Sequence, residues 1–127
     1  MTDDLISFLR ARFDEDEQVV RVDPGFSQEW HTERARADPH DESRACVRSS
    51  QGDVITGDVD VERARHIAHY DPARMLRDVQ ARQHTLVRCQ EEMLSGIPRL
   101  VHFAKRTLWE MAQPYADHDD YQEEWKL

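Results

Sequence analysis

The longest helix that the sequence predicts lies near the centre of the chain, and the other elements have to pack around it. Asp71 is a good residue to cap its start, and Pro72 suits its first turn, where the missing N–H of proline would have no partner anyway. Gly96 favours the left-handed conformation that ends helices, and Pro98 prevents continuation. We therefore expect a helix over residues 72–95.

One side of this helix is apolar. Its apolar residues recur at helical spacing: Met75, Leu76, Val79, Leu86, Val87, Met93 and Leu94. Gln83 and Gln90 lie inside this stripe, one heptad apart. If they are buried, they need hydrogen-bond partners, which a pair of facing helices could offer. The alternative, which we favour, places both at the edge of a partly exposed side.

A shorter helix is expected over residues 60–70, with Val61, Ala64, Ile67 and Ala68 on its buried side. Glu62, His66 and His69 lie on the opposite side, at a spacing that can bring three metal-ligating groups together. They are the candidate ligands for a divalent metal, and a metal-dependent hydrolase is one alternative function. The competing interpretation is simpler, because the polar face of an amphipathic helix often carries such residues by chance.

Composition narrows the class of protein. With 127 residues, 39% of them hydrophobic and 34% charged, the chain is expected to form a single domain of residues 1–127 with a modest core. The formal net charge of −9 argues against direct binding to nucleic acid through a basic surface. The sequence has no apolar run of membrane-spanning length, and its acidic start does not resemble a signal peptide. We therefore expect a cytoplasmic protein that does not bind membranes.

The charges are unevenly distributed along the chain. Residues 63–88 carry six arginines and two acids, whereas residues 115–125 carry five acids and no lysine or arginine. The simpler explanation is that acidic ends pack beside a basic middle, within one chain or between protomers. The alternative is an acidic decoy, whose surface imitates nucleic acid and occupies a nucleic-acid-binding protein.

The remaining segments predict an α+β fold, with an N-terminal helix, a small antiparallel sheet and two or three further helices. The first helix is expected to end before the turn at Asp23-Pro24-Gly25. Trp30 lies in a predicted strand, and residues 44–48 and 54–56 form two more. The last predicted helix covers residues 99–113. Its apolar side comprises Leu100, Val101, Ala104, Leu108, Met111 and Ala112, widened by Phe103 and Trp109.

The C-terminal segment mixes aromatic and acidic residues. Its candidate interaction residues are Tyr115, Asp117, His118, Tyr121 and Trp125, which would form a docking peptide for a basic partner. The alternative, which we favour, is that its aromatic side chains anchor the segment onto the body of the protein, since Tyr121 and Trp125 are one helical turn apart.

Three segments carry a family resemblance: MTDDLISFLRARFDEDEQ at the start, ARHIAHYDPARMLRDVQARQ in the middle and QPYADHDDYQEEWKL at the end. Together they resemble a domain-of-unknown-function family of small proteins from actinobacteria and their phages. The ending Pro-Tyr-Ala-Asp-His-x-x-Tyr-x-x-Glu-Trp is the most specific of them. The resemblance implies a cytoplasmic accessory protein associated with mobile elements, and it transfers no catalytic residue.

Among these functions we favour a non-enzymatic protein-interaction or regulatory module. The sequence contains no Gly-rich phosphate loop and no nucleophile elbow, and it indicates no catalytic and no cofactor-binding residue. A long amphipathic helix and an uneven charge distribution are typical of proteins that bind a partner. We expect a homo-oligomer, with the identity of any further protein partner left open.

Overall fold

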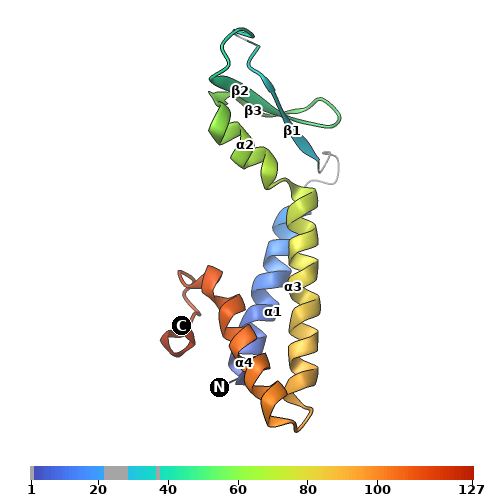
Figure 1. The fold of residues 1–127 in the computed structure, drawn as a ribbon, viewed down its shortest axis with the longest axis vertical. Helices are drawn as coiled ribbons and strands as arrows, with labels where there is room; N and C mark the ends of the chain where they lie inside the picture. Colours follow the sequence, from blue (N-terminus) through green and yellow to red (C-terminus); the bar gives the residue numbers. More distant parts are fainter. Residues whose placement is uncertain (1, 22–28, 37) are drawn as a thin grey trace. The chain divides into compact units, whose positions relative to one another are not determined.

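A computed structural model describes residues 2–21, 29–36 and 38–127 (Figure 1). It confirms the α+β fold: an N-terminal helix, a three-stranded antiparallel sheet and further helices. In chain order the elements are α1 (Thr2–Val20), β1 (Trp30–Arg34), β2 (Arg44–Ser49), β3 (Val54–Asp60), α2 (Val61–His69), α3 (Pro72–Met93), α4 (Pro98–Ala112) and the short 3-10 helices η1 (Gln113–Tyr115) and η2 (Glu123–Trp125). The predicted turn at residues 23–25 lies outside the described residues.

The chain divides into two compact units. The helical unit comprises Met1–Val19 and Asp78–Leu127, and the sheet unit comprises Val20–Arg77. Each unit has its own cluster of buried apolar side chains. The single domain of residues 1–127 stays a prediction.

The core of the helical unit lies between α1, α3 and α4, which run side by side (Figure 1). Its fully buried side chains are Leu5, Phe8, Leu9 and Phe13 from α1, Val79, Leu86 and Cys89 from α3, Ala104, Leu108 and Ala112 from α4, and Trp125 from η2. Their spacing matches the helical period, so each helix buries one stripe. Cys89 serves here as a small apolar side chain, and burial raises the pKa of its thiol.

In the sheet unit, α2 packs against one face of the sheet. The strand order is β1-β2-β3, and both pairs are antiparallel. Ala45 and Val47 point from the central strand toward Ala64 of α2, and all three are buried. Successive side chains of a strand alternate between faces, so Arg44 and Arg48 lie on the other face. There Arg48 contacts Glu33 at 3.0 Å, and Arg44 contacts Asp58 at 2.8 Å.

The third strand is longer than the sequence indicates. The prediction ended it at Thr56, before Gly57 and Asp58, which disfavour strands. In the structure Val59 still pairs with Ala45, and irregularities in the ladder around Val47 absorb the change of register. The pairing of Val59 with the buried Ala45 therefore outweighs the weak strand propensity of Gly57 and Asp58.

The start of α3 matches the prediction. Asp71 precedes the helix and Pro72 is its first residue. The Asp71 carboxylate accepts a hydrogen bond from the backbone N–H of Arg74 at 2.9 Å, and one from the backbone N–H of Trp30 at 3.1 Å. One side chain therefore caps α3 and holds the first residue of β1.

Replacing Asp71 by alanine is expected to lower the free energy of unfolding by about 2 kcal/mol, because two backbone N–H groups lose a charged acceptor. Urea denaturation followed by circular dichroism would measure the change. Asp58 is a suitable control, since its partner Arg44 also contacts Asp60 at 3.1 Å. Asp58→Ala should cost less than 1 kcal/mol, and an equal loss in the two variants would contradict the capping role.

Candidate functional site

The three candidate metal ligands lie on α2, with their side chains exposed. The Glu62 carboxylate contacts the Arg65 guanidinium at 3.3 Å, so its nearest charged neighbour is a cation on its own helix. The rings of His66 and His69 lie beside Tyr70, with centroid distances of 5.1 and 4.9 Å. Among the described residues, no group of three or more His, Cys, Asp or Glu side chains is close enough together to hold a metal ion.

The metal hypothesis stays a prediction with a direct test. If α2 binds a divalent metal, Glu62→Ala and His66→Ala should each lower the bound metal at least tenfold without unfolding the protein. Metal content after equilibration with Zn²⁺, measured by inductively coupled plasma mass spectrometry, gives the answer. His84→Ala is the control, because His84 is an exposed histidine of α3 outside the candidate set. Equal metal content in all these proteins would end the hypothesis.

The aromatic residues of the C-terminal segment fold back onto the helical unit. Trp125 is 2% exposed, and its ring lies 5.0 Å from that of Phe8, measured between centroids. Tyr115, His118 and Tyr121 also place their rings within 6.3 Å of the Phe8 ring. These contacts confirm that the segment is anchored by its aromatic side chains. The docking-peptide role of the same residues stays a prediction.

Polar contacts position the same segment. The Gln113 amide donates to the backbone oxygen of Trp125 at 2.8 Å, and Tyr121 donates to the Gln113 oxygen at 3.3 Å. The backbone N–H of Asp120 donates to Nδ1 of His118 at 3.0 Å, while the other ring nitrogen of His118 contacts the guanidinium of Arg12. Asp117 is exposed. Four of the five candidate residues are therefore occupied within the unit.

Tyr115 makes a short polar contact between the C-terminal segment and α1. Its hydroxyl donates to the Asp16 carboxylate at 2.6 Å and accepts from Arg82 at 3.4 Å. Burial, together with the hydrogen bond to Asp16, raises the pKa of Tyr115 well above its ordinary value of about 10. The folded protein therefore keeps this phenol protonated at a pH where the unfolded chain loses the proton.

Tyr115→Phe is expected to lower the free energy of unfolding by about 1–2 kcal/mol at pH 7, because Asp16 loses its donor. In the wild type, stability should fall as pH rises above about 10, since from there the unfolded state binds fewer protons than the folded state. The variant lacks this contribution, so the difference between the two proteins should shrink at higher pH. Urea denaturation between pH 7 and 11 measures both effects. Tyr70→Phe, at an exposed position, is the control, and a pH-independent difference would contradict the role of this phenol.

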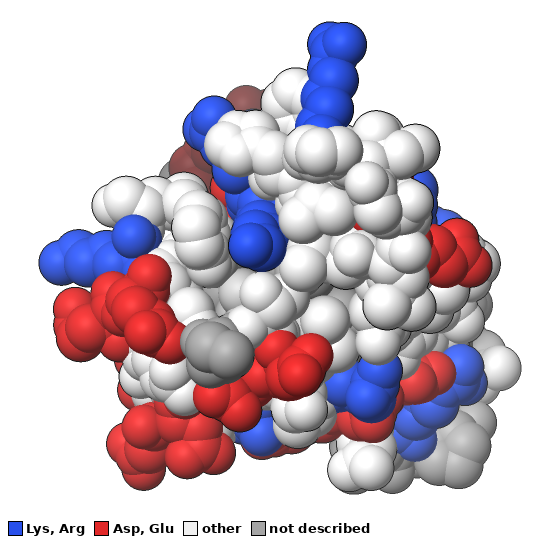
Figure 2. Space-filling view, turned by 90° about the horizontal axis from the view of Figure 1, so that it is seen from below, with Lys and Arg blue, Asp and Glu red and all other residues white. Residues whose placement is uncertain are grey.

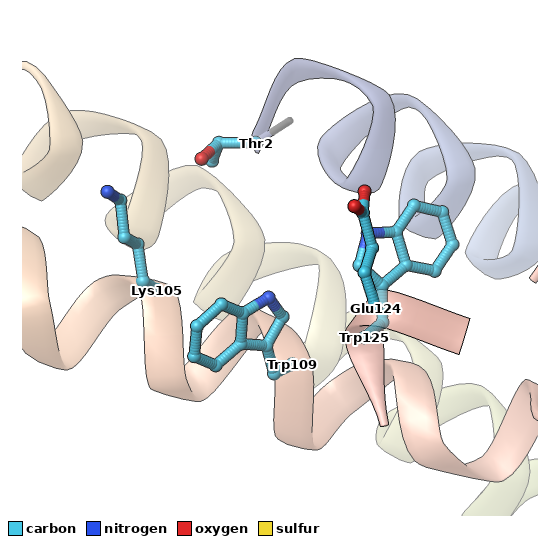
Figure 3. A pocket seen from close by; sticks show the side chains of 5 residues that line it. All are labelled: Thr2, Lys105, Trp109, Glu124 and Trp125. Carbon is cyan, nitrogen blue, oxygen red and sulfur yellow. The ribbon is translucent and has the colours of Figure 1, made fainter. Parts of the chain in front are cut away.

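A hollow of about 220 Å³ lies beside Trp125. It is lined by Thr2 of α1, Lys105 and Trp109 of α4, and Glu124 and Trp125 of η2 (Figure 3). The Lys105 amino group and the Glu124 carboxylate stand at opposite sides of the opening. Acid–base catalysis requires both groups within reach of the same atoms. Because these two groups lie apart, they are better suited to contact with the surface of another protein.

Several large apolar side chains of the helical unit are exposed, and four of them lie on the apolar sides that the sequence predicts. Leu94 is 87% exposed, Val87 55%, Phe103 50% and Trp109 38%. They are exposed because helical periodicity defines a wide apolar arc, and neighbouring helices cover only part of it. Ile97, in the turn between α3 and α4, is also exposed. Figure 2 shows a broad surface without charged side chains at this end of the unit, with acidic side chains gathered at one side.

A second hollow, of about 270 Å³, lies between α1 and α3. Its lining residues are Arg10, Phe13 and Asp14 from α1 and Gln83, Leu86, Val87 and Gln90 from α3. We call it the α1–α3 groove. Gln83 and Gln90 are half-buried at its rim, which confirms the prediction that they lie at the edge of the apolar side. Their place in the heptad pattern was the sequence signal for this groove, whereas nothing in the sequence singled out Arg10 or Asp14.

Comparison of the chain with curated proteins and with solved structures gives no match. None of the helices in the described ranges is long and apolar enough to cross a membrane. A family profile, however, matches residues 2–127, and so covers the stretches between the three familiar segments as well as the segments themselves. The chain belongs to DUF6221, a family of unknown function.

Proposed function

We propose that this protein is a non-enzymatic interaction module that acts as a homodimer and regulates or assists other proteins by contact. The exposed apolar side chains of the helical unit carry this proposal: Val87, Leu94, Ile97, Phe103 and Trp109. Exposing so much apolar surface costs free energy in water, and proteins that do so commonly cover it with a partner.

Charged residues on the same unit favour binding over catalysis. On α4, the Arg99 guanidinium lies 5.8 Å from the centre of the exposed Phe103 ring. Arginine and aromatic side chains are enriched where proteins bind one another, because they combine a large contact area with polar recognition. The acids of the C-terminal segment supply the opposite charge on the same unit.

Native mass spectrometry of the untagged protein, without chelator, tests the proposal. A dimer that retains no metal is the expected result over a range of concentrations from about 1 to 100 μM, which covers moderate affinities. A protein that stays monomeric throughout would overturn the homodimer. A stoichiometric metal adduct would instead favour the metal hypothesis for Glu62, His66 and His69.

The acidic decoy is a separate proposal that needs carboxylates in rows spaced like the phosphates of a duplex. On the face shown in Figure 2, lysine and arginine side chains lie among and beside the acids, which favours ordinary protein contact there. A cytoplasmic location and an association with actinobacteria, their phages and mobile elements belong to the proposal of an interaction module. The association rests on the resemblance of the three segments.

A further inference from the structure

The α1–α3 groove has the lining of a site that packs against another helix. All seven of its lining residues come from α1 and α3. Phe13 and Leu86 form a buried apolar floor, and Val87 stands exposed above it. Apolar floors with polar rims are typical of grooves that receive helices. The side chains around this groove indicate which helix would bind in it.

The rim of the groove is complementary to itself. The helices α1 and α3 run in opposite directions (Figure 1), and the contact between Gln83 and Glu17, at 3.2 Å, sets their relative level. On α1, Arg10 and Asp14 are one helical turn apart, so the α1 side of the rim carries a cation and an anion. On α3, Gln83 and Gln90 lie one turn to either side of the Leu86–Val87 step.

The rim groups also have unused hydrogen-bonding and charge capacity. Among the described residues, Arg10 and Asp14 form no ion pair, and the side-chain amide of Gln90 forms no hydrogen bond. Gln83 uses its amino group on Glu17 and leaves its oxygen available as an acceptor. Half-buried amides gain stability when a partner supplies the missing hydrogen bonds.

We propose that the α1–α3 groove is the homodimer interface, with a two-fold axis in the interface plane, perpendicular to the helices. In this arrangement α1 packs antiparallel against the α1 of the second copy, and α3 packs against its own copy. Arg10 then faces Asp14 of the second copy, Gln83 faces Gln90, and Val87 meets Val87 near the axis. Each contact occurs twice, as in any isologous interface, except the one at the axis. The two α1–α3 pairs form a four-helix arrangement.

A second copy of this chain suits the groove because it presents the required pattern in the required order. The cation, the apolar centre and the anion of one rim each meet their complement when the same rim is turned by 180°. An unrelated helix would need an acid, an apolar residue and a base at matching positions. This inference rests on the proposed homodimer and specifies its surface and symmetry.

Charge reversal tests the arrangement. Arg10→Glu places two pairs of like charges across the interface, with Asp14 of each opposite copy, and Asp14→Arg does the same with Arg10. Each single variant should weaken dimerisation at least about tenfold in Kd, measured by sedimentation equilibrium. The double variant R10E/D14R restores opposite charges and should return to within about threefold of the wild type. Arg106→Glu, at an exposed position on α4, is the matched control.

These variants separate the two proposals. If the wild type is a dimer and the single reversals behave like R106E, the groove is not the interface, whereas the homodimer stands. If the wild type is a monomer at every concentration, both proposals fail. Circular dichroism of each variant shows that the fold is retained, since both positions are exposed on α1.

A cysteine at the two-fold axis tests the register directly, at concentrations where the wild type is a dimer. Val87→Cys should form a disulfide between two copies under mild oxidation, because only residues near the axis bring their Cα atoms within the roughly 4.4–6.8 Å that a disulfide requires. The native Cys46 and Cys89 are buried, which shields them from exchange. Arg106→Cys, at an exposed position on α4, should stay monomeric on a non-reducing gel. Absence of a V87C dimer, or equal dimer in R106C, would overturn this register.

Discussion

Trp125→Ala is expected to lower the free energy of unfolding by about 3–5 kcal/mol, the largest effect of a single substitution predicted for this protein. The indole is 2% exposed although it lies two residues from the C-terminus, and it packs against Phe8 of α1 and Tyr121. Its removal leaves a cavity in the core of the helical unit and exposes the Phe8 ring to water. Urea denaturation followed by circular dichroism at 222 nm gives the change in free energy.

Trp109→Ala provides the control for this prediction. Trp109 lines the same hollow as Trp125 (Figure 3), but its side chain is 38% exposed, so its removal should cost about 1 kcal/mol or less. A similar loss in both variants would mean that the C-terminal segment contributes no more than surface packing. The larger loss in W125A would make the segment an integral part of the core, although it follows the last long helix.

Leu108→Ala is expected to lower the free energy of unfolding by about 2–5 kcal/mol, because Leu108 is fully buried between α1, α3 and α4. The same variant tests whether the two units unfold together. If the chain is one cooperative domain, as its length predicts, L108A should lower the free energy of hydrogen exchange of the slowest β2 amides. The decrease should equal the decrease in the global free energy of unfolding. Unchanged exchange in β2 would show that the sheet unit unfolds independently.

The reciprocal substitution is Val47→Ala in the sheet unit, which should cost about 2 kcal/mol because Val47 is fully buried under α2. If the chain is a single domain, V47A should lower the free energy of hydrogen exchange of the α4 amides by the same amount. Arg106→Ala, on the exposed face of α4, should change neither probe by more than about 0.5 kcal/mol.

The local elements of this protein follow from local chemistry and were predictable from the sequence. Asp71 and Pro72 start α3, and Gly96, with a φ of 71°, adopts the left-handed conformation that its position after the helix predicts. The small antiparallel sheet and the burial of Ala64 were also predicted correctly. Backbone hydrogen bonding, capping and apolar spacing act over a few residues, so the sequence carries these signals directly.

The candidate site was only partly predictable. The heptad spacing of Gln83 and Gln90 marked an unusual side of α3, whereas Arg10 and Asp14 looked like ordinary surface charges of α1. They line one groove because α1 and α3 run in opposite directions and bring residues about 70 positions apart to the same level. Likewise, the aromatic side chains of the C-terminal segment were expected to anchor it, but the sequence did not indicate that Phe8 would be their partner.

The sequence by itself determined which segments form helices and strands, and which side of each helix is broadly apolar. Tertiary structure alone decided which part of that apolar side is covered. Leu86 and Cys89 are buried, while Val87 of the same helix and Leu94, directly after it, are exposed although they are equally apolar. The physical reason is that burial depends on the neighbours that reach a side chain, and α1 and α4 together cover only part of the circumference of α3.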